Sequence, residues 1–159
     1  MGHAVAVLLS LLLVAATVIV HYEFLRLTSA VTSRLSIPGR AQILVIIAMV
    51  FVAHLVEIGL YTAAYFACHN WWALGGIHGD TEGGIVDYFY FSITTFTTLG
   101  FGDVQPRGPV RLIAGFQSLN GLVLIGWSAS FTYLSMERFW QDGPADARSV
   151  TKNGETDRS

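Results

Sequence analysis

The sequence TTFTTLGFGDVQP occupies residues 94–106, near the middle of a chain of 159 residues. It places Gly100 and Gly102 one residue apart, behind a run of threonines and inside an apolar neighbourhood. Glycine weakens helices and strands, and buried threonine hydroxyls need hydrogen-bond partners. The composition therefore indicates a special backbone in which ordinary and left-handed dihedrals alternate, because glycine takes the left-handed ones at little cost.

Three apolar segments surround this stretch, and each is close to the length of a membrane-spanning helix. They are residues 4–20, 41–67 and 110–133. About 20 apolar residues cross the hydrocarbon core, so the first segment is at the short end, and Phe24, Leu25 and Leu27 can extend it. A cleaved signal peptide is the alternative for this segment. Its length and the absence of Lys or Arg before it favour a retained helix.

Residues 88–96 form an apolar, aromatic segment that is too short to span, and Asp87 precedes it. Within hydrocarbon, non-helical backbone survives only where protein or a water-filled path surrounds it. A half-length helix followed by the Thr98–Gly102 stretch therefore implies a cavity or pore. The sequence predicts an all-α membrane protein with an outer helix, a re-entrant pore helix and an inner helix, preceded by one additional transmembrane helix.

The composition agrees with a membrane location. The chain is 53% hydrophobic and 13% charged, whereas an ordinary soluble domain is about 25% charged. The net charge of −2 and the single lysine argue against a nucleic-acid partner.

The scattered polar residues do not suggest catalysis. A single cysteine, Cys68, excludes an intrachain disulfide; we expect a small apolar filler, with a disulfide to a second copy as the alternative. His3, His21, His69 and His78 are interpreted as interfacial or loop residues, not ligands. Because no nucleophile–base pair, metal cluster or phosphate loop is recognisable, we expect no enzyme activity, no cofactor and no organic substrate.

The residues Thr98–Asp103, TLGFGD, resemble the selectivity filter of potassium channels, whose pattern is Thr-x-Gly-(Tyr or Phe)-Gly, commonly followed by Asp. The resemblance covers about residues 43–136. It implies that rings of backbone carbonyls replace the water shell of K⁺, the permeant ligand. The filter residues would be Thr98, Leu99, Gly100, Phe101 and Gly102, with K⁺ held at the first four. One pore segment per chain is a quarter of a ring, which predicts a cyclic homotetramer with three further copies of the chain.

Other residues near the filter are expected to support it. They are Tyr90, Phe91, Thr94, Thr95, Thr97 and Asp103. The threonine hydroxyls are expected to bond backbone carbonyls one turn back or neighbouring filter groups. Tyr90 and Phe91 stand where the family often has tryptophans. Thr94 stands where some members carry a Glu that pairs with the Asp after the filter, so Asp103 is expected to lack that partner.

Two ionisable residues, His54 and Glu57, lie in the middle of the second apolar segment. A carboxylate at this depth costs about 2.5–3.5 kcal/mol and should have a partner. Asn120 and Gly121 lie at similar depth on the third apolar segment. One hypothesis is that His54 and Glu57 hydrogen-bond to Asn120 and tie the outer helix to the inner helix. The other is a proton-sensitive gate, since histidine titrates near physiological pH.

The chain divides into three predicted parts. Residues 1–40 form the additional helix and a cytoplasmic connector, residues 41–140 the pore domain, and residues 141–159 a disordered cytoplasmic tail. Three arginines in the connector, Arg26, Arg34 and Arg40, agree with the positive-inside rule, and the filter's Asp end should face outward. We therefore expect an integral protein of the bilayer, in a bacterial inner membrane, with the N-terminus outside and the C-terminus in the cytoplasm.

The functional prediction is a tetrameric K⁺-selective channel that conducts passively. Two alternatives stay open, a poorly selective monovalent cation channel and a non-conducting membrane subunit with a pore-like fold.

Overall fold

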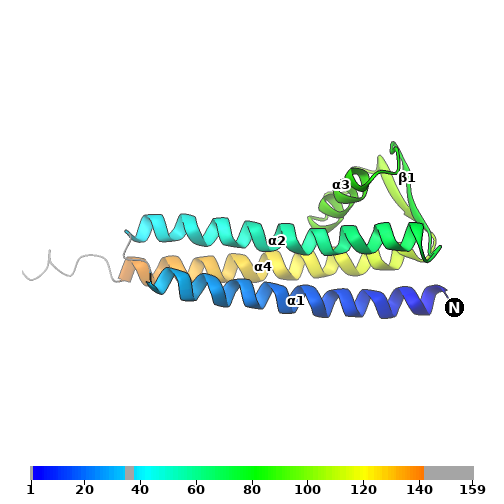
Figure 1. Cartoon of the computed structure of the whole chain (residues 1–159). Coiled ribbons are helices and arrows are strands. Elements are labelled where there is room, and N and C mark those ends of the chain that lie inside the picture. Colours follow the sequence, from blue (N-terminus) through cyan, green and yellow to red (C-terminus); the bar gives the residue numbers. More distant parts are fainter. Residues whose placement is uncertain (1, 35–37, 142–159) are drawn as a thin grey trace, which may run out of the picture.

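Three long helices lie side by side in the computed structural model, which describes residues 2–34 and 38–141. They are α1 (Gly2–Arg34), α2 (Gly39–Asn70) and α4 (Val110–Gln141). In Figure 1, α1 and α4 begin at the end of the bundle that holds the N-terminus, and α2 runs the opposite way. By length and composition, all three can cross a membrane. The predicted all-α membrane fold is confirmed.

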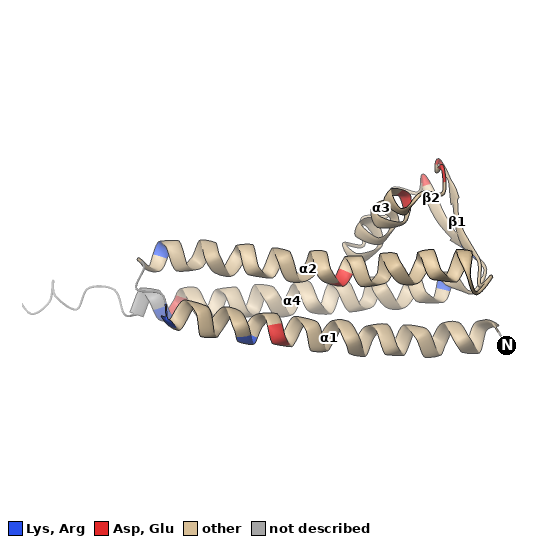
Figure 2. Cartoon of the chain, in the orientation of Figure 1, with Lys and Arg blue, Asp and Glu red and all other residues tan. Residues whose placement is uncertain are grey.

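The first helix is longer than its apolar run. It continues to Arg34 and so contains Arg26, which we had placed in a connector. That placement is wrong, because residues 21–34 contain no helix breaker and the Arg26 guanidinium binds the Glu23 carboxylate one turn back at 2.7 Å. The helix α1 is described to Arg34, and Pro38 is the residue that precedes α2. Figure 2 shows acidic and basic positions close together on α1.

Two predicted segments lie wholly or partly outside the described residues. Residues 35–37 of the predicted connector are not described. The predicted tail falls on residues 142–159, which are not described either.

A small two-stranded sheet lies at one end of the bundle. Strand β1 (Gly76–Gly79) pairs antiparallel with β2 (Val104–Arg107), with Gly76 opposite Arg107 and Gly79 opposite Val104. Strands of four residues are too short for alternation of polar and apolar side chains to reveal them in a sequence.

The short helix α3 (Ile85–Phe96) lies between the two strands in the chain and contacts α2 and α4 beside the sheet. The Asp87 carboxylate accepts hydrogen bonds from the backbone N–H groups of Glu82 and Gly84, both at 3.0 Å. These contacts order the chain where the helix begins and place a negative charge at its positive end. This is the predicted re-entrant segment.

Aromatic side chains wedge α3 against the bundle. Phe91 packs edge-on against Tyr65 of α2, with ring centroids 5.1 Å apart, and Tyr88 packs against Phe66. Cys68 is fully buried in the same cluster, as the filler interpretation predicted. A disulfide to a second copy would therefore require the chain to open. The aromatic cluster therefore positions α3, and residues 98–102, which we call the glycine-rich stretch, follow the end of this helix.

Candidate functional site

The backbone φ angles of the glycine-rich stretch alternate in sign. Thr98, Gly100 and Gly102 have positive φ angles of 59°, 47° and 87°. Every second residue is therefore left-handed, which is the pattern that the glycine spacing predicted. The positive φ of Thr98 was not anticipated, because a β-branched residue is rarely found there. A backbone of this kind can turn successive carbonyls toward one side.

The stretch is anchored to the end of α3 through its amide groups. The N–H groups of Leu99 and Gly100 both donate to the carbonyl oxygen of Thr94, at 2.9 and 3.2 Å, and the N–H of Thr98 donates to that of Thr95. The helix therefore passes directly into the stretch. The amide groups of Thr98, Leu99 and Gly100 therefore point back toward α3.

Threonine hydroxyls on α3 bond within the helix, as predicted. The Thr94 hydroxyl donates to the carbonyl oxygens of Tyr90 and Phe91, both at 3.1 Å. The Thr97 hydroxyl donates to that of Ile93 at 2.9 Å. The local hydrogen bonds of the Thr94 hydroxyl allow this polar side chain to be buried, whereas Thr97 is exposed.

The inner helix α4 touches the last turn of α3. The Ser118 hydroxyl donates to the Thr95 carbonyl oxygen at 3.1 Å. At Gly121 a Cβ atom would collide with the carbonyl oxygen of Phe96. Gly121 is therefore needed for close approach of α4 to the point where the glycine-rich stretch begins.

The Thr94 hydroxyl bonds backbone carbonyls and not Asp103, as expected, but Asp103 has another partner. Its carboxylate accepts a hydrogen bond of 2.7 Å from the Tyr90 hydroxyl and another of 3.0 Å from the Val104 N–H. The Tyr90 hydrogen bond is the main cause that lowers the pKa of Asp103 below its ordinary value, and the same bond raises the pKa of Tyr90. Tyr90 precedes Thr94 by one turn on α3, so it replaces the expected residue from the same helix face.

Behind the glycine-rich stretch, Gln117 joins α4 to α2 and α3. Its side-chain nitrogen donates to the carbonyl and hydroxyl oxygens of Ser92, at 3.1 and 2.8 Å. Its side-chain oxygen accepts from the Tyr65 hydroxyl at 2.5 Å. All three side chains lie where the bundle meets α3, so they hold the pore helix in place.

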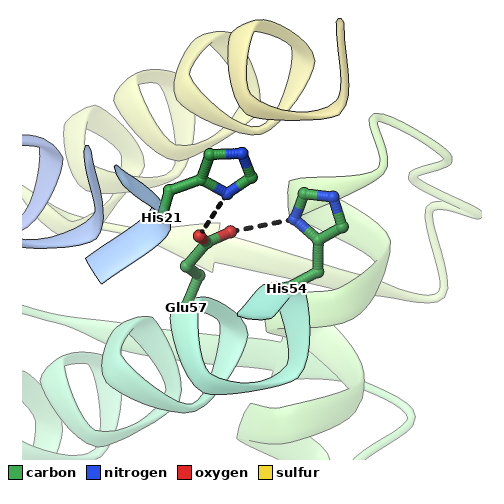
Figure 3. A group of neighbouring side chains, drawn as sticks. All are labelled: His21, His54 and Glu57. Carbon is green, nitrogen blue, oxygen red and sulfur yellow. Dashed lines mark hydrogen bonds and ion pairs between the residues drawn. The ribbon is translucent and has the colours of Figure 1, made fainter. Parts of the chain in front are cut away.

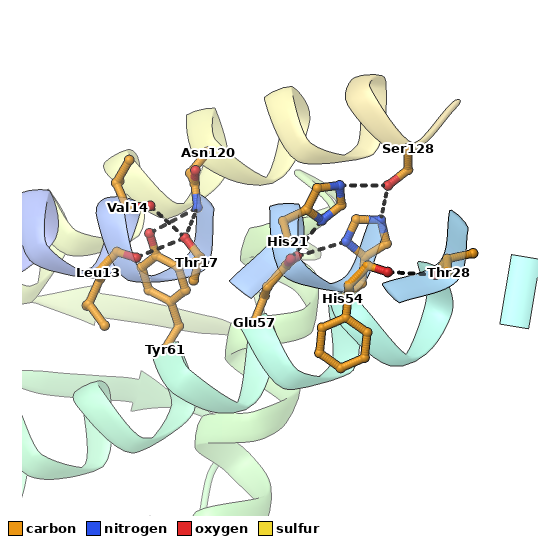
Figure 4. Close-up of polar contacts among 11 residues, drawn as sticks. Leu13, Val14, Thr17, His21, Thr28, His54, Glu57, Tyr61, Asn120 and Ser128 are labelled. Carbon is orange, nitrogen blue, oxygen red and sulfur yellow. Dashed lines mark hydrogen bonds and ion pairs between the residues drawn. The ribbon is translucent and has the colours of Figure 1, made fainter. Parts of the chain in front are cut away.

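A second polar layer contains Asn120 and joins α4 to the other two long helices (Figure 4). Its side-chain nitrogen donates to the Thr17 hydroxyl at 2.8 Å and to the Tyr61 hydroxyl at 3.4 Å. The hypothesis that Asn120 bonds His54 and Glu57 is therefore wrong. Its partners on α1 and α2 lie one helical turn from His21 and Glu57, toward the two-stranded sheet. Asn120 still joins α2 to α4, as proposed.

A third layer holds the two ionisable residues and a histidine from α1 (Figure 3). The Glu57 carboxylate lies 2.8 Å from His21 Nδ1 and 2.9 Å from His54 Nδ1. The Nε2 atoms of the two rings lie 3.2 and 3.1 Å from the Ser128 hydroxyl of α4. The interpretation of His21 as an interfacial or loop residue is wrong, since it is completely buried.

A sequence signal for His21 exists. The buried polar residues of α1 recur at spacings of four or seven, which places them on one helix face: Ser10, Thr17, His21, Thr28 and Thr32. His21, His54 and Glu57 each offer one ligand atom, and these atoms lie within 4.8 Å of one another. Two imidazoles and a carboxylate are ligand types that divalent transition metals accept.

Comparisons with known proteins concern the region from α2 to α4. The sequence profile of the family described as "Ion channel" matches residues 43–137. The inward rectifier potassium channel Kirbac3.1 of Paramagnetospirillum magnetotacticum is 30% identical over 95 residues, which are 59% of this chain and 30% of that protein. The two-pore potassium channel 1 of Arabidopsis thaliana is 43% identical over 51 residues, 31% of this chain and 14% of that protein.

The chain thus matches less than a third of the length of either relative. No solved structure matches it. The family match begins after α1, so the helix that carries His21 lies outside it.

Proposed function

Because this chain belongs to the ion channel family, we propose that it is a K⁺-selective channel that conducts passively through rings of backbone carbonyls. The observation that carries the proposal is the alternation of positive φ angles at Thr98, Gly100 and Gly102. The K⁺ ligands are the carbonyls of Thr98, Leu99, Gly100 and Phe101. Both relatives described above are potassium channels by name, which supports K⁺ as the permeant ion. The function includes no enzymatic step.

The channel is a homotetramer in this proposal. One chain supplies one glycine-rich stretch, and a closed ring needs several. Leu99 and Phe101 are 58% and 67% exposed in the single chain, and nothing within the chain lies within 4 Å of a Cβ placed at Gly100. Exposed apolar side chains beside open space at Gly100 are consistent with a surface that other copies cover.

The proposed orientation follows from the position of the N-terminus. Gly2 lies beside Pro109, at the end of the bundle that holds the two-stranded sheet. If the Asp103 end of the filter faces outward, α1 begins outside and α4 ends in the cytoplasm. The chain is an integral membrane protein, and we propose the bacterial inner membrane as its location.

A poorly selective cation channel is the second candidate. Phe101 has no phenolic hydroxyl to brace the filter, and its side chain is largely exposed within the chain. A filter with fewer braces discriminates less sharply between K⁺ and Na⁺, if rigidity contributes to selectivity.

The test is ion flux from vesicles that contain the purified full chain. We expect K⁺ flux from the natural chain and none from Gly100→Ala, because a Cβ at φ 47° strains the filter. Gly59→Ala is the matched control, since nothing in the chain lies within 4 Å of its added Cβ. Reversal potentials in mixed K⁺ and Na⁺ decide between the two candidates. Tetramers that pass no ion would contradict both and support the non-conducting subunit.

A further inference from the structure

Two imidazoles and one carboxylate meet in the interior of the bundle, where the channel function gives them no role. His21 comes from α1, and His54 and Glu57 come from α2 (Figure 3). We propose that these three side chains form a binding site for a divalent transition-metal ion of the zinc type.

The ligand atoms already converge. Both Nδ1 atoms face the same carboxylate, at 2.8 Å for His21 and 2.9 Å for His54. Zinc binds nitrogen and oxygen ligands at about 2.0–2.2 Å, so two ligands of a tetrahedral ion lie about 3.4 Å apart. Each contact must therefore open by about half an ångström on this geometry, which small side-chain rotations can supply.

Ser128 supplies the outer contacts that such a site needs. Its hydroxyl oxygen lies 3.2 Å from Nε2 of His21 and 3.1 Å from Nε2 of His54. A histidine that binds metal through Nδ1 carries its proton on Nε2, and that N–H is normally hydrogen-bonded. One hydroxyl oxygen can accept two hydrogen bonds, so Ser128 can hold both rings in the metal-binding tautomer.

Counting protons favours an additional cation. When the carboxylate of Glu57 accepts an N–H from each neutral ring, both Nε2 atoms are acceptors. The Ser128 hydroxyl has one proton and can donate to only one of them. With a metal ion at the Nδ1 atoms, both ring protons lie on Nε2, and both of these N–H groups can donate to the Ser128 oxygen. An extra proton on one ring would also complete the set, and the experiment below separates the two.

Charge and burial also suit a cation. Glu57 and His21 have fully buried side chains, and the side chain of His54 is 16% exposed, which makes it the ligand by which an ion can enter. A carboxylate removed from water is costly unless a positive charge accompanies it.

The ion would fasten α1 to the region that matches the channel family, because His21 lies outside that region and the other two ligands lie inside it. The His54 ring also contacts Phe96, the last residue of α3, with ring centroids 5.4 Å apart.

The experiment is metal binding by the full chain, purified in detergent without a polyhistidine tag and stripped with a chelator. After dialysis against Zn²⁺, elemental analysis should find one zinc per natural chain. Co²⁺ should give the visible absorption of a tetrahedral site. His21→Gln and Glu57→Gln should lose both signals. His78→Gln removes an exposed imidazole on strand β1 and should keep both signals.

Ser128→Ala is a second test, in which all three ligands stay in place and only the contact to their Nε2 atoms is removed. It should weaken Zn²⁺ affinity by about 10- to 100-fold, as loss of an outer contact does. A natural chain that retains no more zinc than His21→Gln would overturn the proposal and leave the extra proton as what completes the contacts. So would unchanged affinity in Ser128→Ala. Because no ion flux is measured, this outcome is separate from that of the channel proposal.

Discussion

At the scale of single residues, one hydroxyl joins the Asp103 end of the glycine-rich stretch to α3. Tyr90 donates to the Asp103 carboxylate at 2.7 Å, and both side chains are exposed in the single chain. The bond spans from the middle of α3 to the residue that follows Gly102. It therefore fixes the far end of the stretch to the helix from which the stretch emerges.

Removing that hydroxyl should change the response to acid. The pKa of Asp103 is lowered mainly by Tyr90, so Tyr90→Phe should return it toward the ordinary value of about 3.9. A carboxyl group with a lowered folded-state pKa stabilises the fold above its unfolded pKa, and this contribution is lost as the pH falls through the folded-state pKa. In Tyr90→Phe, the loss of K⁺ flux on acidification should therefore begin at higher pH.

Flux measured between about pH 5 and pH 2.5 tests this prediction, since that window brackets the ordinary pKa of Asp. Tyr133→Phe is a suitable control, because Tyr133 lies on α4 and is 62% exposed. If the acid profiles of the two variants coincide, the Tyr90–Asp103 bond does not control the Asp103 end of the stretch.

At the scale of elements, the approach of α4 to α3 sets where the pore helix ends. Gly121→Ala should destabilise the protein by about 1–3 kcal/mol, because the added methyl group meets the Phe96 carbonyl and the helices must separate. Gly59→Ala should instead be neutral or stabilise by up to about 1 kcal/mol, since alanine is the better helix former. Thermal unfolding of the two variants, with K⁺ flux alongside, measures both effects. Equal unfolding temperatures would show that α3 and α4 do not need this approach.

The elements that the sequence predicts well are those with a local physical cause. Apolar length predicts the three spans, and the spacing of Gly100 and Gly102 predicts alternation of the backbone. Strands β1 and β2 have no such signal, because each is four residues long and pairs with a segment more than 20 residues away. The end of α1 was misjudged because charge was taken as a boundary, although Glu23 and Arg26 pair along the helix.

The polar partners could be predicted only in part. The need of Glu57 for a partner follows from the cost of a buried charge, but the identity of that partner depends on how the helices pack. His21 lies 36 residues from Glu57, and no local pattern joins them. The periodic polar face of α1 would have narrowed the choice to a few residues of that helix.

At the scale of the whole molecule, α1 makes the bundle a three-helix structure with a polar seam. Thr17 and His21 contribute to two successive layers, and each layer also contains residues of α2 and α4. A buried polar group without its partner is costly, so these layers fix how α1 is rotated and how far it slides along its neighbours.

Removal of α1 should therefore reverse the effect of one substitution. In the full chain, Glu57→Leu leaves the Nδ1 groups of His21 and His54 without their acceptor, and should destabilise by about 1–3 kcal/mol for each such group. In a chain of residues 38–159, Glu57 has lost its α1 cover. A carboxylate facing lipid at mid-bilayer costs about 2.5–3.5 kcal/mol, so Glu57→Leu should now stabilise.

Thermal unfolding of the four proteins in one detergent measures this reversal. Leu44→Ala serves as the control on the same helix, because Leu44 is 69% exposed and its effect should be alike with and without α1. The argument depends on the sign and not on the size of the change, since loss of α1 alters overall stability as well. If Glu57→Leu shifts both chains in the same direction, α1 does not supply the partner of this carboxylate, and the first helix is a neighbour of the pore domain instead of part of its core.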